Sequence, residues 1–82
     1  MYKITAKIDG MMCGMCEAHI CDEIRRAFPN AKKVSASRKR AEAVFLSEEE
    51  IDETLIKKVI DATGYTLVGV ITEPYRKRGL FK

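Results

Sequence analysis

The chain lacks the features by which most enzymes, membrane proteins and exported proteins are recognised. Its 82 residues include one histidine, with no serine placed beside it, no paired-carboxylate site and no phosphate-cradling glycine loop. No stretch offers the roughly 18 consecutive apolar residues of a membrane span, and the start of the chain has no basic segment followed by an apolar one. We therefore expect a cytoplasmic binding protein, not an enzyme, without membrane insertion.

Aromatic residues are also scarce, at 7% of the chain, and they do not interleave with the basic runs at residues 32–33, 38–40 and 76–78. Nucleic acid is therefore not an expected partner, because single-stranded binding sites need stacking positions among their charges. The formal net charge is only +3. These basic runs are expected to be solvated surface, with docking on an acidic protein or an anionic lipid surface as the alternative.

A chain of this length forms one small domain with a thin core, so its function should lie on the surface. We expect the domain to cover residues 1–73 and a basic tail to cover residues 74–82. The initial Met1 and the basic end favour a standalone chain, and a domain excised from a larger ATPase is the alternative.

Hydrophobic periodicity predicts six elements in the order strand, helix, strand, strand, helix, strand. The second helix has two terminal signals, a capping box of Ser47 and Glu50 and a closing glycine at Gly64. This order favours an α+β, ferredoxin-like βαββαβ sandwich, in which a four-stranded antiparallel sheet carries two helices on one face. The predicted strands cover residues 2–8, about 34–36, 43–46 and 65–71, and the first helix covers about 16–28.

Each predicted helix has an apolar stripe that should face the sheet. The stripe of the first helix comprises Ile20, Ile24, Ala27 and Phe28, and that of the second comprises Ile51, Leu55, Val59 and Ile56, with either Ile60 or Ala62.

The informative segment is the pair Cys13 and Cys16, spaced as CxxC where a loop opens the first helix. In a reducing cytosol such a pair is more often a metal or redox site than a structural disulfide. The unpaired amides and dipole at a helix N-terminus favour the thiolate form, which is the form that binds metals. Two soft donors select a soft ion such as Cu(I), whereas a structural Zn(II) site usually needs four ligands.

The segment Gly10-Met11-x-Cys13-x-x-Cys16, with Gly64-Tyr65 much later, resembles the heavy-metal-associated (HMA) domain family over about residues 2–73. That family includes copper chaperones and the metal-binding domains of copper-transporting P-type ATPases, and it has the βαββαβ fold. The resemblance implies that Cys13 and Cys16 are the metal ligands. It also implies that Met11 packs beneath the metal loop and that Tyr65 lies beside the site.

Two residues depart from the usual pattern of that family, His19 and Cys21. His19 lies about 60° round the helix from Cys16, and Cys21 about 140°. Both are candidate auxiliary ligands, with a solvated histidine and a small residue at the edge of the core as the alternatives.

Taken together, the residues and the resemblance predict a cytosolic Cu(I) metallochaperone that delivers copper by thiolate exchange to a P-type ATPase or its CxxC domain. Zn(II) or another soft metal is the alternative cargo. We expect the chain to be a monomer without metal, and a metal-bridged dimer is the alternative once metal is bound. Two other functions stay open: a metal-binding domain of a heavy-metal-transporting ATPase, and a glutaredoxin-like thiol-disulfide oxidoreductase. Neither Pro29 nor Pro74 stands where a glutaredoxin places its cis-proline.

Overall fold

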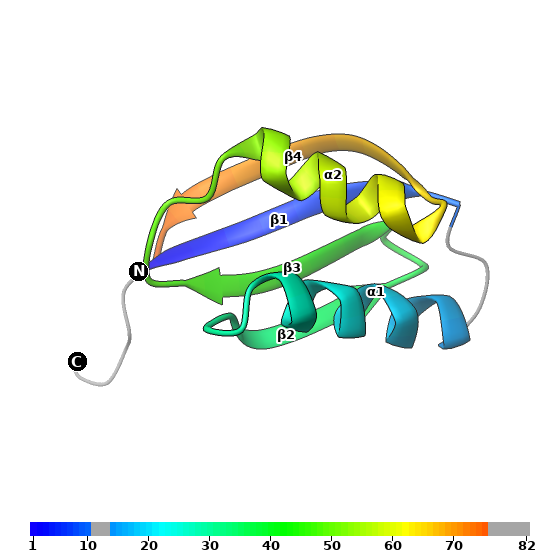
Figure 1. The fold of residues 1–82 in the computed structure, drawn as a ribbon, viewed down its shortest axis with the longest axis horizontal. Helices are drawn as coiled ribbons and strands as arrows, with labels where there is room; N and C mark the ends of the chain where they lie inside the picture. Colours follow the sequence, from blue (N-terminus) through cyan, green and yellow to red (C-terminus); the bar gives the residue numbers. More distant parts are fainter. Residues whose placement is uncertain (11–13, 76–82) are drawn as a thin grey trace.

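The structure is a computed structural model, and it describes residues 1–10 and 14–75. It contains four strands and two helices in the predicted order (Figure 1). The α+β fold class is therefore confirmed. The elements are β1 (Tyr2–Asp9), α1 (Gly14–Ala27), β2 (Lys32–Ser37), β3 (Glu42–Ser47), α2 (Glu53–Thr63) and β4 (Thr66–Pro74).

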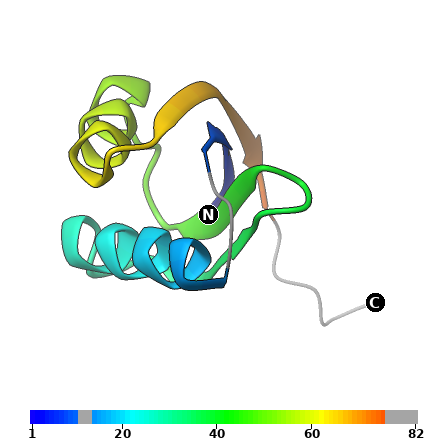
Figure 2. The same cartoon turned by 90° about the vertical axis from the view of Figure 1, so that its right-hand side faces the viewer.

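The four strands form one sheet in the order β2-β3-β1-β4, and every neighbouring pair is antiparallel. β1 and β2 both run antiparallel to β3, so they are parallel to each other and α1 forms the crossover between them. Both helices lie on the same face of the sheet (Figure 2). This topology brings the end of β1, the start of α1, the turn between β2 and β3, and the start of β4 to one end of the molecule (Figure 1).

The core lies between that face of the sheet and the two helices. On β1 the alternating side chains of Ile4, Ala6 and Ile8 are buried, as the period of the strand predicts. Phe28 stacks on Phe45, with ring centroids 5.8 Å apart. Burying a large apolar side chain stabilises the fold by about 1.5–3 kcal/mol. The buried apolar residues of the other elements are Ile20, Ile24, Ala43, Phe45, Leu46, Ile56 and Ile60.

The apolar stripes of the helices are narrower than the sequence predicted. Ala27 and Ala62 are exposed, and Leu55 is 49% exposed. Ile56 and Ile60, four residues apart on α2, point into the core. Leu55 precedes Ile56 by one residue, so it is turned about 100° away from that direction.

The second helix starts later than the capping box predicted. Its N-cap is Asp52, whose carboxylate accepts a hydrogen bond from the Thr54 N–H at 3.0 Å. The Ser47 hydroxyl instead makes a local turn, in which it donates to the Glu49 carbonyl at 2.6 Å and accepts from the Glu49 N–H at 3.2 Å. The predicted helix start was therefore wrong by several residues, because the same serine can bond to a turn as well as to a helix.

The ends of two other elements also differ from the expectation. α1 begins at Gly14, before Cys16, and β4 continues to Pro74. β4 continues past Ile71 because it stays paired with β1 as far as the match of Tyr2 with Pro74. Within residues 1–10 and 14–75, no helix has the length and apolar character needed to cross a membrane.

Candidate metal centre

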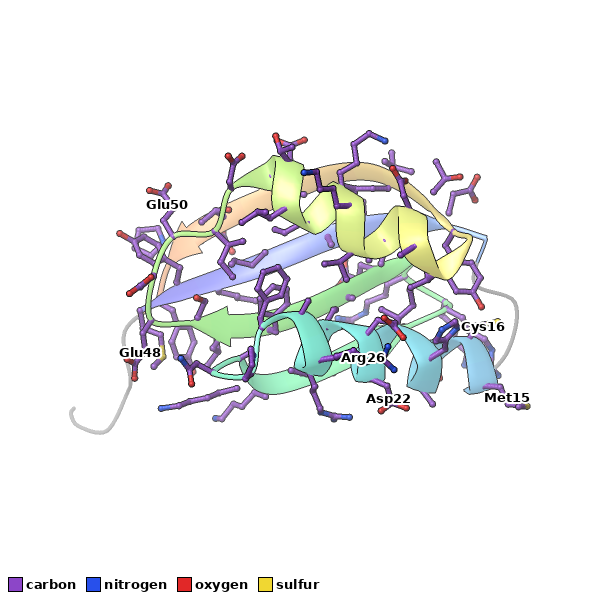
Figure 3. The ribbon with its side chains drawn as sticks, viewed as in Figure 1. Met15, Cys16, Asp22, Arg26, Glu48 and Glu50 are labelled. Atoms are coloured by element: carbon purple, nitrogen blue, oxygen red, sulfur yellow. The ribbon has the colours of Figure 1, made fainter. Side chains whose placement is uncertain are left out.

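Cys16 lies in the first turn of α1, at the end of the molecule where the four segments meet. Its side chain is half-buried against the core, whereas the neighbouring Met15 is 82% exposed. Figure 3 shows Met15 and Cys16 at this end and Glu48 and Glu50 at the opposite end. The Cys16 side chain in the first turn of α1 therefore packs against the core on one side and lies beside the exposed Met15 on the other.

Two of the residues predicted at the site, Cys13 and Met11, lie outside the described residues. The residues on either side, Gly10 and Gly14, are described. Gly10 follows the last residue of β1, and Gly14 is the first residue of α1. The structure therefore fixes the two ends of the segment that carries Cys13.

Tyr65 lies against the backbone of Gly10. Gly10 has φ +107°, and a Cβ atom built on it would lie 3.2 Å from Cδ1 of the Tyr65 ring. The sheet register explains this contact, because Asp9 pairs with Thr66 and the residues beyond them emerge side by side. Gly64 ends α2 with φ 93°, and its N–H donates to the Asp61 carbonyl at 3.1 Å. The C-cap of α2 thus places Tyr65 beside Gly10, where the segment that carries Cys13 begins.

His19 contacts the same tyrosine from the helix side. The rings of His19 and Tyr65 meet edge to face, with centroids 6.2 Å apart. The His19 Nε2 atom lies 3.8 Å from Oε2 of Glu23, and the imidazole is 47% exposed. Tyr65 therefore lies between Gly10 at the end of β1 and a side chain one helical turn beyond Cys16.

Cys21 lies further along α1 and is half-buried. Burial raises the pKa of the Cys21 thiol, although the nearby Arg25 acts in the opposite direction. A raised pKa disfavours the thiolate, which is the metal-binding form. Among residues 1–10 and 14–75, no three His, Cys, Asp or Glu side chains are grouped so that they could hold a metal ion. An auxiliary ligand role for His19 or Cys21 stays a prediction.

The turn between β2 and β3 adds a charged pair that the sequence did not reveal. The backbone N–H of Arg38 donates to Oε2 of Glu17 at 2.8 Å, and the Arg38 Nη1 atom lies 3.8 Å from Oε1 of the same carboxylate. Glu17 follows Cys16 directly. Arg38 and Glu17 are 21 positions apart in the sequence. Their contact could have been predicted only from the crossover topology, which places the β2–β3 turn beside the start of α1.

Of the two sulfurs predicted to bind the metal, that of Cys16 lies in the described residues. Cys16 stands where the unpaired amides of a helix N-terminus favour a thiolate. Gly14 and Met15 beside it are exposed. A pair of thiolates at such a position suits an ion of low coordination number better than a closed four-ligand site.

Comparison with known proteins gives two sequence relatives. No family model matches the chain. A mercuric reductase of Staphylococcus aureus is 43% identical over 65 residues, which cover 78% of this chain and 11% of the relative. A mercuric reductase of Lysinibacillus sphaericus is 34% identical over 65 residues, which cover 79% of this chain and 12% of the relative. The chain thus spans about a ninth of the length of these relatives.

Two solved structures share the fold over almost their whole length. One, from work on crosstalk between Cu(I) and Zn(II) homeostasis, has a TM-score of 0.71 at 20% identity and covers 84% of this chain and 97% of that one. The other is the apo N-terminal domain of the zinc(II) ATPase ZiaA, with a TM-score of 0.60 at 25% identity, covering 88% of this chain and 96% of that one. The chain is therefore similar, in sequence and in fold respectively, to proteins named for heavy-metal ions, in line with the HMA-like resemblance of its sequence.

Proposed function

We propose that this chain binds one soft metal ion between the thiolates of Cys13 and Cys16 and passes it to a cysteine pair on another protein. The observation that carries the proposal is the position of Cys16, half-buried in the first turn of α1 at an accessible end of the molecule. The helix N-terminus favours the thiolate, and the CxxC spacing brings a second thiolate within reach of the same ion. The likeness to an ATPase domain and to mercuric reductases supports metal handling.

The transfer proceeds by replacing one sulfur at a time. An incoming thiolate forms a bond to the ion, and the bond to Cys16 or Cys13 then breaks, so the metal keeps at least two sulfur ligands throughout. A second exchange completes the transfer, and the released thiolates take up protons from water. The exposed Gly14 and Met15 leave room for the incoming ligand beside Cys16. Because no bare ion is released, tight binding and rapid transfer are compatible.

The first candidate cargo is Cu(I), delivered to a P-type ATPase or its CxxC domain. A two-thiolate site gives Cu(I) the soft, low-coordination environment that it prefers. The structural likeness to a domain of a zinc(II) ATPase and to a structure from work on Cu(I) and Zn(II) homeostasis supports metal transport as the setting.

The second candidate cargo is Hg(II), delivered to cysteines of a mercuric reductase. The sequence identity of 43% and 34% to two such enzymes favours it. Hg(II) also binds two thiolates, so the same pair of cysteines serves either ion.

Loading experiments decide between the cargoes. The reduced protein is offered Cu(I), Hg(II) or Zn(II), each in competition with a calibrated chelator or thiol, and the complexes are counted by native mass spectrometry. We expect one Cu(I) or Hg(II) per chain, or one per two chains if the metal bridges a dimer, and weaker Zn(II). The Cys21→Ser variant is the matched control and should load like the wild type. A wild type that binds none of the three ions more tightly than the Cys16→Ser variant would refute the proposal.

A further inference from the structure

Two hydrogen bonds hold the turn between β2 and β3, one to the backbone of β1 and one to a side chain at the start of α1. The Ala41 carbonyl accepts from the Ile8 N–H at 2.7 Å, near the end of β1. The Arg38 N–H donates to Glu17 Oε2 at 2.8 Å, in the first turn of α1. The turn is therefore tied to both segments that flank the cysteine loop. The position of Arg38 is set by its backbone as well as by its side chain.

The guanidinium of Arg38 lies beside both Glu17 and Gly14. Its Nη1 atom lies 3.8 Å from Glu17 Oε1 and 3.7 Å from the place where a Cβ atom on Gly14 would stand. Gly14 lies between the two cysteines in the sequence. Arginine stays protonated throughout the range in which proteins fold. A permanent positive charge therefore stands beside the backbone that joins the two sulfurs.

The net charge of the metal complex depends on the ion. Two thiolates with Cu(I) carry a net charge of minus one, whereas two thiolates with Hg(II) are neutral. A nearby positive charge stabilises the first complex and leaves the second almost unaffected. Loss of the Arg38 charge would also leave the Glu17 carboxylate unneutralised beside Cys16, which disfavours the anionic complex further.

We infer that Arg38 is a specificity-determining residue, whose charge beside Gly14 favours Cu(I) over Hg(II) at the cysteine pair. The inference rests on the proposed function, because it needs both ions to bind at Cys13 and Cys16. Arg38 lies beside Gly14, and it acts on the ion through the charge of the complex.

The test compares Cu(I) and Hg(II) affinities, each measured against its own calibrated competitor, in the wild type and three variants of the full chain. Arg38→Gln removes the charge, Arg38→Lys keeps it, and Lys39→Gln removes an equal charge from the next position in the turn. We expect Arg38→Gln to lower the ratio of Cu(I) to Hg(II) affinity by about 2- to 5-fold, the range of a partly exposed charge pair. Arg38→Lys should restore most of the ratio, and Lys39→Gln should change it less than half as much.

Two further measurements separate this role from a structural one. The change in the ratio should shrink as the salt concentration rises, because salt screens exposed charges. The unfolding midpoint of the metal-free Arg38→Gln variant shows whether the turn is still folded. An equal loss of affinity for both ions, an unchanged ratio, or an equal effect of Lys39→Gln would overturn the inference. A wild type that binds neither ion would overturn the inference, and one that also fails to bind Zn(II) would refute the proposed function.

Discussion

Replacing Gly10 by alanine tests the backbone geometry at the end of β1, where the segment that carries Cys13 begins. Gly10 has φ +107°, a conformation that L residues rarely adopt. Forcing a side chain into such a region costs about 1–3 kcal/mol. The new Cβ atom would also lie 3.2 Å from the Tyr65 ring, closer than the usual carbon–carbon contact of about 3.5–4.0 Å. Both effects destabilise the folded protein.

Part of that loss is offset, because alanine restricts the unfolded chain by about 0.4–1 kcal/mol more than glycine does. We expect Gly10→Ala to lower the free energy of unfolding by about 2 kcal/mol, which corresponds to roughly 8–16 °C in the unfolding midpoint of a domain of this size. The assay is thermal unfolding of the reduced, metal-free protein, followed by circular dichroism.

Two other glycines provide matched controls. Gly64 has φ +93° but nothing within 4 Å of an added Cβ atom, so Gly64→Ala should show the backbone strain without the contact. Gly69 has neither feature, so Gly69→Ala should be close to neutral. In a Tyr65→Ala background, Gly10→Ala should lose the part of its effect that comes from the contact. If Gly10→Ala is no more destabilising than Gly69→Ala, the described geometry of Gly10 against Tyr65 is wrong.

Three further predictions concern the second helix, an ion pair and the tyrosine. Asp52→Ala should lower the free energy of unfolding, measured by urea denaturation, by about 1 kcal/mol, as expected for the loss of an N-cap. Ser47→Ala should lower it by less. The Lys7 ammonium, 2.7 Å from Glu42, lowers the pKa of that carboxyl below its ordinary 4.5. The ion pair therefore stabilises the fold above pH 4.5, and its effect disappears as the pH falls through the lowered pKa of Glu42, so the stability gap between wild type and Glu42→Gln should close as the pH falls below 4.5. Tyr65→Ala should speed metal loss to a competing chelator in stopped-flow measurements, and Tyr65→Phe should change it little. An unchanged rate of metal loss in Tyr65→Ala would show that the tyrosine has only a packing role.

The fold could be predicted because its signals are local. The alternation of Ile4, Ala6 and Ile8 identified the first strand, and Gly64 identified the end of the second helix. The start of that helix was predicted wrongly because Ser47 and Asp52 both carry helix-capping side chains. Which of the two residues caps the helix depends on how far the chain runs from β3 before it turns back over the sheet. The types of the local residues do not specify that distance.

The candidate site could be predicted only in part. The CxxC spacing predicts Cys13 and Cys16 as a ligand pair, and the resemblance to a family predicts that Tyr65 lies beside them. The contact of Tyr65 with Gly10 depends on the register of β1 and β4, and the contact of Arg38 with Glu17 depends on the crossover between β1 and β2. Both contacts join residues far apart in the sequence, so they can be predicted only once the pairing of the strands is known.

The predicted metal ligands are tested most directly by metal stoichiometry and affinity in single cysteine variants. Cu(I) and Hg(II) are each titrated into the reduced wild type and into Cys13→Ser, Cys16→Ser and Cys21→Ser, with circular dichroism to verify the fold. We expect Cys13→Ser and Cys16→Ser each to lose high-affinity binding and stay folded, and Cys21→Ser to bind like the wild type. Wild-type affinity in folded Cys13→Ser and Cys16→Ser, or a loss confined to Cys21→Ser, would refute the assignment of Cys13 and Cys16 as the metal ligands.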